Sequence, residues 1–198
     1  MRFGKGGDWY GEQFIFDGDR TSFDTATSSH TRSVFAQFVS SQDFILKEGL
    51  LGGEFSTAWA LQHLDETHAK LQLLGNKKIG GRELIGVQYY SKSGTDMQVK
   101  LYFDPETYHH VMTVYEIEIP AGNAVQITGG AFLHDTRYTI EERFSGFQAV
   151  DGLTLPSRYQ LQFTQELQNG NTRVYDWDMT SDQIRQNLSL DSANFRLR

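Results

Sequence analysis

Apolar and polar residues alternate strictly along much of the second half of the chain. Tyr138 and Ile140 alternate with polar neighbours, and the same period of two returns between Tyr159 and Phe163. Such alternation is typical of an antiparallel sheet with one face buried and one face in water. With an Asp-Gly turn between the two runs, the pattern predicts a β-hairpin over residues 137–167.

The same period predicts strands over most of the chain. A hairpin is expected at 8–23, and Asp104-Pro105 marks the turn of another at 101–119. A turn is expected at 76–81. Single strands are expected at 70–74, 82–92, 97–103, 108–119, 137–147, 153–167 and 172–180. Strands at this regular spacing indicate a sandwich or an open, curled barrel.

Helical periodicity is limited to one segment. A helix is expected from Thr31 or Ser33, because a hydroxyl side chain can cap it and one stripe is apolar. The stripe consists of Val34, Phe35, Phe38 and Val39. Residues 55–64 fit a strand or a short helix, and the strand is favoured. A short helical or strand-like piece is expected at 184–190, and a long loop at 121–135.

The segment from Gly49 to Gly53 is an apolar loop between glycines. Leu50 and Leu51 lie inside it, where a solvated loop would carry polar residues. Two interpretations fit: a buried connection, which is favoured, and a mobile lid over a cavity.

Composition limits the function more than the fold. A chain of 198 residues is expected to form one domain, 1–198, with an adequate core. Its net charge of −7 argues against a nucleic-acid binder. The absence of cysteine excludes disulfides, thiolate nucleophiles and cysteine-ligated metals. The sequence contains no run of 18 apolar residues, so it predicts no membrane-spanning helix.

The ionisable residues form no recognisable catalytic motif. The histidines lack the spacing of metal ligands, and the adjacent His109 and His110 point to opposite sides of a strand. They are therefore interpreted as scattered surface residues. Asp176 and Asp178 share a strand face, which is interpreted as solvated. Without a nucleophile motif the chain is predicted to be no enzyme and to need no cofactor or metal.

Two segments resemble the LolA-type lipoprotein-carrier superfamily, most closely its uncharacterised exported bacterial members. They are LYFDPETYHHVMTVY (101–115) and YTIEERFSGFQAVDGLTLPSRYQLQF (138–163). The resemblance implies a mainly β (α+β) fold: a single strongly curved antiparallel sheet, or half-open barrel, with one or two covering helices. Typical members begin with a signal peptide and an amphipathic helix, and by this resemblance the chain is expected to start after them.

The resemblance also implies a function. Relatives of this shape hold acyl chains or other lipid-like ligands in the hollow of the sheet, in the periplasm. We therefore expect non-enzymatic binding or transport of an apolar small molecule, a lipid or a lipoprotein acyl chain in a bacterial envelope. The residues expected to line the hollow are Phe35, Phe38, Leu50, Leu51, Phe55, Trp59, Val87, Tyr89, Leu101, Phe103, Tyr115 and Tyr175.

A second hypothesis stays open at this point. The aromatic stripes can also pack a dry core, since stripes at strand spacing are usually core. The protein would then be an interaction or assembly module, a homodimer or the partner of another protein, that pairs through an exposed sheet edge.

Overall fold

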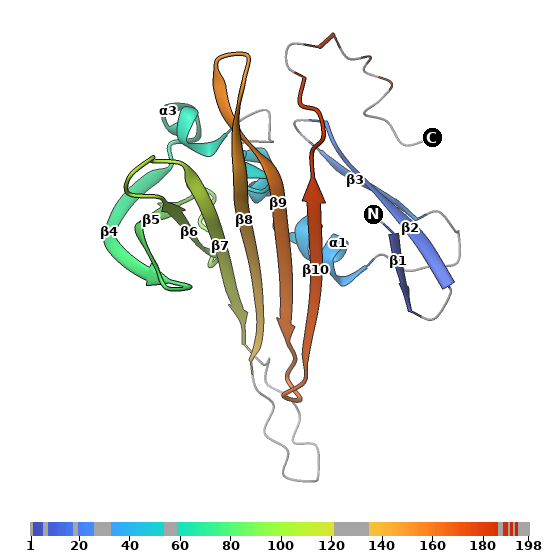
Figure 1. Ribbon diagram of the computed structural model, residues 1–198. Coiled ribbons are helices and arrows are strands. Elements are labelled where there is room, and N and C mark those ends of the chain that lie inside the picture. Colours follow the sequence, from blue (N-terminus) through green and yellow to red (C-terminus); the bar gives the residue numbers. More distant parts are fainter. Residues whose placement is uncertain are drawn as a thin grey trace. The chain divides into compact units, whose positions relative to one another are not determined.

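The computed structural model describes most of the chain: residues 2–5, 8–17, 20–25, 33–53, 59–120, 135–185, 188, 189, 191 and 193. The chain divides into two compact units, one formed by residues 1–63 and 185–198 and the other by residues 64–184. Each unit has its own sheet (Figure 1). The described chain is mainly β, as the alternation predicts.

The first unit contains a three-stranded antiparallel sheet in the order β1-β2-β3. Its strands are β1 (Arg2–Lys5), β2 (Asp8–Phe16) and β3 (Thr21–Thr25). The pairing of β2 with β3 confirms the hairpin predicted at 8–23, whereas β1 was not predicted.

Short helices follow these strands among the described residues of the first unit. Helix α1 (Val34–Ser41) begins where predicted, because the Ser33 hydroxyl accepts a hydrogen bond from the Ala36 amide at 3.0 Å. Helix α2 (Phe44–Lys47) follows. The strand favoured for 55–64 is wrong over its second half, since η2 (Ala60–Gln62) is a 3₁₀ turn. The good helix formers in this turn explain the difference.

The second unit is built around a seven-stranded antiparallel meander, in the order β10-β9-β8-β7-β6-β5-β4. A single helical turn, α3 (Leu64–Thr67), precedes it. The strands are β4 (Lys70–Ile79), β5 (Arg82–Tyr90), β6 (Gln98–Phe103), β7 (His110–Ile119), β8 (Thr136–Val150), β9 (Leu153–Glu166) and β10 (Thr172–Thr180). The structure therefore confirms an antiparallel sheet, but not as the single sheet expected, since β1, β2 and β3 form a separate one.

Strand β4 is longer than predicted. It continues to Ile79 through a bulge between Leu73 and Gly75, so the turn expected at 76–81 shrinks to Gly80-Gly81. Both turn glycines have positive φ angles, 56° and 83°. A bulge interrupts the period of two, which made the second half of β4 look like a turn. The predicted loop at 121–135 lies outside the described residues except for Asp135, and the described part of 184–190 forms neither helix nor strand.

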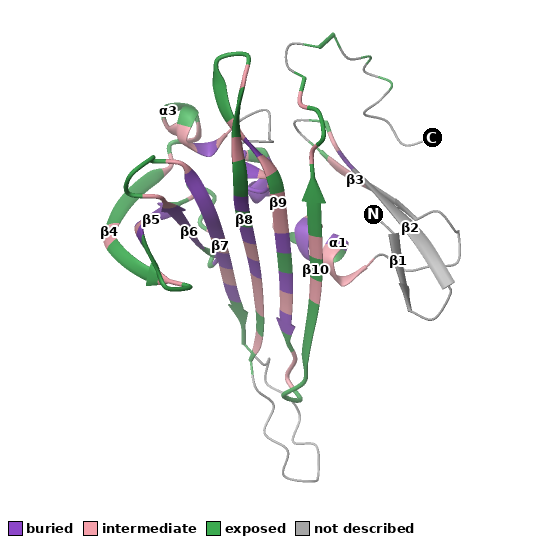
Figure 2. Ribbon diagram, in the orientation of Figure 1, coloured by how far each residue is buried: buried purple, intermediate pink, exposed green. Residues whose placement is uncertain are grey.

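The register divides the seven-stranded sheet into two different faces. One face, called the apolar face, carries a row of almost fully buried side chains across five strands: Tyr89, Val99, Tyr115, Ile140 and Phe163. The opposite, polar face carries Lys100, Glu116, Glu141, Gln162 and Asp176. Figure 2 shows this alternation of burial along β8 and β9. A small apolar cluster of Leu84, Tyr102, Val111 and Met112 also lies on the polar face.

Candidate functional site

Half of the predicted ligand-binding residues gather on the apolar face of the second unit. The register places them on one side of β5, β6, β7 and β10, so period two identified them correctly as one face. Tyr89, Leu101 and Tyr115 are buried, and the other three are half-buried. The six are Val87, Tyr89, Leu101, Phe103, Tyr115 and Tyr175.

The other predicted residues belong to the first unit. Phe38, Leu50 and Leu51 are buried there. Phe35 and Trp59 are half-buried, and Phe55 lies outside the described residues. The amides of Leu50 and Leu51 both donate to the Ile45 carbonyl, at 2.9 and 2.8 Å. The backbone amides of this loop are hydrogen-bonded and its leucine side chains are buried. Both observations fit the favoured interpretation of the loop, a buried connection.

A fully buried carboxylate lies at the centre of the apolar face. Glu142 on β8 has an exposed fraction of 0 %. The hydroxyl groups of Tyr115 on β7 and Tyr159 on β9 each donate to one of its oxygens at 2.6 Å. The two tyrosines lie on the strands that flank β8. Tyr115 pairs with Ile140 and Tyr159 pairs with Phe144, so both are diagonal to Glu142, and the carboxylate links three strands.

Burial changes the acidity of both tyrosines. The pKa of Tyr115 and the pKa of Tyr159 lie well above the ordinary value of 10, mainly because burial disfavours the phenolate. The adjacent Glu142 adds to both shifts, since it repels a second negative charge and accepts a hydrogen bond from each protonated hydroxyl group. The tyrosines therefore act as neutral donors throughout the physiological pH range.

A histidine and a threonine extend this polar cluster. His110 and Thr113 on β7 are buried, with exposed fractions of 1 % and 0 %, and Thr113 lies directly opposite Glu142. The Nε2 atom of His110 lies 2.8 Å from Thr113 Oγ1 and 3.0 Å from the Met112 carbonyl. The interpretation of His110 as a surface histidine is wrong, because its ring packs between Phe103 and Phe144 at centroid distances of 5.2 and 4.9 Å.

The cluster does not arrange His110 as a base for Thr113. A carbonyl only accepts hydrogen bonds, so the contact with Met112 places the proton on Nε2. In that tautomer Nε2 cannot take the threonine proton, and Thr113 serves as an acceptor. Burial also lowers the pKa of His110 to about 4, which keeps the ring neutral. The geometry therefore does not activate Thr113 as a nucleophile through His110.

One half of this cluster left a signal in the sequence, and the other half did not. Glu142 follows Tyr138 and Ile140 in the apolar register and precedes Phe144, so a charged residue at that position was detectable. His110 was hidden by a bulge in β7, where Tyr102 pairs with Met112 but Phe103 pairs with His110. The extra residue turns His110 onto the same face as Thr113.

The carboxylates of the polar face behave as a solvated surface. The Asp176 carboxylate accepts from Gln162 at 2.8 Å, and Asp178 forms an exposed ion pair with Arg158. This arrangement fits the predicted wet face, and an open groove of about 580 Å³ with both polar and apolar lining side chains lies there. Within the described ranges no three His, Asp or Glu side chains come together as a metal site.

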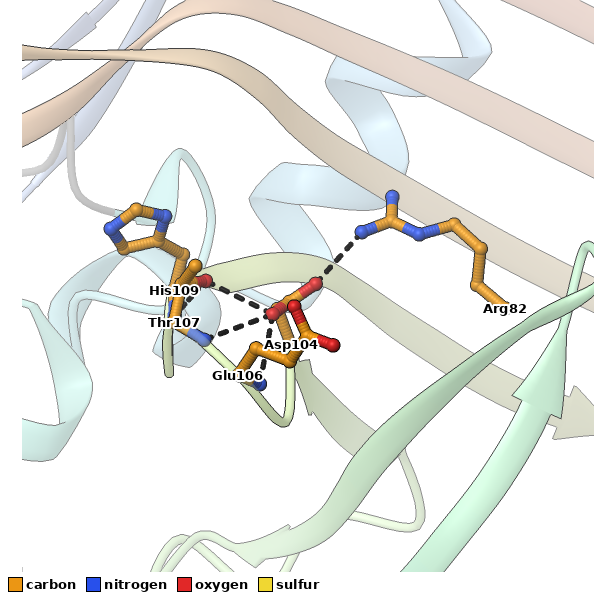
Figure 3. Close-up of polar contacts among 5 residues, drawn as sticks. All are labelled: Arg82, Asp104, Glu106, Thr107 and His109. Atoms are coloured by element: carbon orange, nitrogen blue, oxygen red, sulfur yellow. Dashed lines mark hydrogen bonds and ion pairs between the residues drawn. The ribbon is translucent and has the colours of Figure 1, made fainter.

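The Asp104 turn between β6 and β7 is held by its own side chain (Figure 3). One carboxylate oxygen accepts from the amides of Glu106 and Thr107, each at 3.0 Å, and the other from Arg82, also at 3.0 Å. These bonds, led by that of the Thr107 amide, lower the pKa of Asp104. Next to this turn, His109 stacks on Phe147, which packs against the small apolar cluster on the polar face.

Comparisons with known proteins add no identity. No protein family, curated protein or solved structure matches this chain. In the part of the chain that the structure describes, no helix is both long and apolar enough to cross a membrane.

Proposed function

We propose that this protein binds an apolar or acylated ligand on the apolar face of its seven-stranded sheet, without transforming it. The polar cluster of Tyr115, Glu142 and Tyr159 would receive a hydrogen-bond donor of the ligand, such as an amide or a hydroxyl group. The surrounding aromatic and aliphatic side chains would take its chain, at roughly 0.8 kcal/mol per buried methylene.

The position of Glu142 carries this proposal. A carboxyl group removed from water costs free energy, and the two donors that the structure assigns to it are neutral tyrosine hydroxyls. A face that only packed a dry core would be equally well served by leucine at this position. Buried ionisable groups among apolar residues concentrate at binding sites, because they orient the ligand.

In this proposal a ligand would approach past Tyr159. Tyr159 is only partly buried, whereas Tyr115 and Glu142 are closed off. Rotation of the Tyr159 side chain would therefore expose the carboxylate oxygen that it covers. The half-buried rings of Phe103 and Tyr175 lie on the same face and would contact the apolar part of the ligand.

The LolA-like resemblance supports the same function. The seven-stranded antiparallel meander agrees with the sheet that the resemblance implies. The half-barrel shape, the covering helices and the location in a bacterial envelope remain parts of this proposal.

A matched pair of variants tests the role of the carboxylate. Glu142→Leu removes the buried acceptor, and Glu141→Leu makes the same change one residue earlier, on the polar face. We expect Glu142→Leu to bind a fluorescent long-chain acyl amide about tenfold more weakly than wild type, as the loss of a buried hydrogen bond predicts. Glu141→Leu should bind as wild type does.

A second probe separates the polar group from the chain. A fluorescent alkane of the same length should bind equally to wild type and Glu142→Leu, once circular dichroism has shown that both are folded. Equal binding of the amide to wild type and Glu142→Leu would refute the role of the carboxylate. If neither probe binds wild type, the apolar face is not a ligand site.

A further inference from the structure

We infer that the ligand of the apolar face carries a second hydrogen-bond donor, which binds the side-chain carbonyl oxygen of Gln165. This assignment rests on the function proposed above, and it narrows the class of ligand to an apolar chain with a donor group at each end. One donor would bind the polar cluster around Glu142, and the other would bind Gln165.

Gln165 is a buried polar residue on β9, with an exposed fraction of 6 %. The register places it opposite Tyr138 and two residues beyond Phe163, on the apolar face. Its Nε2 atom donates to the Tyr138 hydroxyl oxygen at 3.2 Å. Its carbonyl oxygen is also buried, and it accepts no hydrogen bond from the described residues.

An unpaired acceptor at this depth indicates that a donor is missing. Buried polar side-chain atoms nearly always have a hydrogen-bond partner, because folding removes the water that solvated them. Arg173 lies opposite Gln165 on β10, but it is exposed and does not donate to this oxygen. An apolar side chain would fill the same space without an unpaired acceptor. The amide therefore favours a donor that arrives with the ligand.

The spacing of the two polar points sets the length of the ligand. Glu142 lies opposite Leu161, which precedes Gln165 by four residues on β9. At a rise of about 3.3 Å per residue, the two points are about 13 Å apart along the strand. Ile140 and Phe163 pair with each other between them and are fully buried. A ligand that spans the two points therefore needs an apolar middle.

A row of aromatic rings crosses the face between these points. Phe163 stacks with Tyr138 on β8 and with Tyr175 on β10, each at a centroid distance of 6.0 Å. The two outer rings are half-buried, so they retain surface for contact with a ligand. Aromatic rings offer a large apolar area with defined geometry. The row therefore favours an extended apolar chain over a compact polar molecule.

Three fluorescent acyl amides of one chain length test the second donor on the full chain. The first ends in a methyl group, the second in a hydroxyl group, which can donate, and the third in a methoxy group, which only accepts. We expect wild type to bind the hydroxyl probe about fivefold more tightly than the methyl probe, as one buried hydrogen bond predicts. The methoxy probe should show no gain.

The three probes separate failure of the second donor from failure of the proposed function. Equal binding of the methyl and hydroxyl probes would mean that water serves the Gln165 oxygen, and it would overturn the second donor while the proposed function stands. An equal gain for the methoxy probe would overturn the donor as well. If none of the three probes binds wild type, both proposals fail.

A matched pair of variants assigns the gain to Gln165. Gln165→Met replaces the amide by an apolar group of similar shape. Gln162→Met makes the same change on the polar face of the same strand, where Gln162 donates to Asp176. Gln165→Met should bind the methyl and hydroxyl probes equally, whereas Gln162→Met should keep the full gain. A gain that survives in Gln165→Met would overturn the assignment.

Chain length provides a measurement that needs no variant, in case Gln165→Met does not fold. The gain of the hydroxyl probe should be largest when its hydroxyl group lies about 13 Å from its amide, and it should disappear in shorter chains. The same gain at every chain length would show that the hydroxyl group binds elsewhere, and it would overturn the two-point geometry.

Discussion

Glu141 and Glu142 are neighbours on β8, yet they lie in opposite environments. The Glu141 side chain is 25 % exposed on the polar face and pairs with Arg143. The Glu142 side chain is fully buried on the apolar face and accepts hydrogen bonds from two tyrosine hydroxyls. A carboxylate on the polar face loses little solvation free energy, because water still contacts it. On the apolar face the loss is large, because water no longer solvates the group.

The comparison shows how far period two determines chemistry. Alternation assigns each glutamate to a face, and the face then decides whether its partner is a charged, solvated group or a neutral, buried donor. Exposed ion pairs contribute little because water and salt screen them. A buried carboxylate is supported only as long as its donors stay in place.

The largest effect is expected when both tyrosine donors of Glu142 are removed. The double variant Tyr115→Phe/Tyr159→Phe leaves the carboxylate buried without these two hydrogen bonds. We expect the free energy of unfolding to fall by about 3–5 kcal/mol, measured by urea denaturation at pH 7.

Tyr90→Phe is the matched control for that variant. The Tyr90 hydroxyl also donates to a side chain, Gln72, at 2.7 Å, but Tyr90 is 49 % exposed. Its loss should change the stability by no more than about 0.5 kcal/mol. A double variant that is as stable as the control would show that Glu142 does not depend on its tyrosines.

His110 gives the comparison a pH dependence. Burial holds its folded pKa at about 4, below the ordinary value of 6.5. Between these values the imidazole of His110 binds a proton in the unfolded chain but not in the folded chain. The free energy of unfolding therefore falls as the pH drops from 6.5 to 4. The contribution of His110 to this loss is about 3 kcal/mol at pH 4.

The variant His110→Phe isolates that contribution. Phenylalanine fits between Phe103 and Phe144 by shape and cannot bind a proton. Urea denaturation at pH 7, 6, 5 and 4 should show that the variant loses about 3 kcal/mol less than wild type over this range. Parallel curves for the two proteins would mean that the histidine is not held neutral.

The smallest effect is expected on the polar face. Lys100 and Glu116 form a part-exposed ion pair at 2.6 Å. A double-mutant cycle with Lys100→Met and Glu116→Gln should give a coupling energy of about 0.2–1 kcal/mol that decreases in high salt. The corresponding cycle on Tyr115 and Glu142 should give the larger value. Equal coupling on both faces would remove the distinction between them.

The sequence predicted the sheet well because alternation depends only on which face is buried. It placed the strands β5 to β10 and gathered six candidate residues on one face. It failed where the backbone breaks the period, at the bulges beside Leu73 and His110. The polar cluster escaped prediction because its members come from three strands, and the partner of a buried charge cannot be read from local spacing.

Native mass spectrometry of the full chain, followed by organic extraction and lipid analysis, tests the central claim most directly. A ligand-binding apolar face predicts a co-purifying acylated or otherwise apolar species in near-stoichiometric amount. A mass equal to the chain alone, together with an extract free of lipid, would contradict that function.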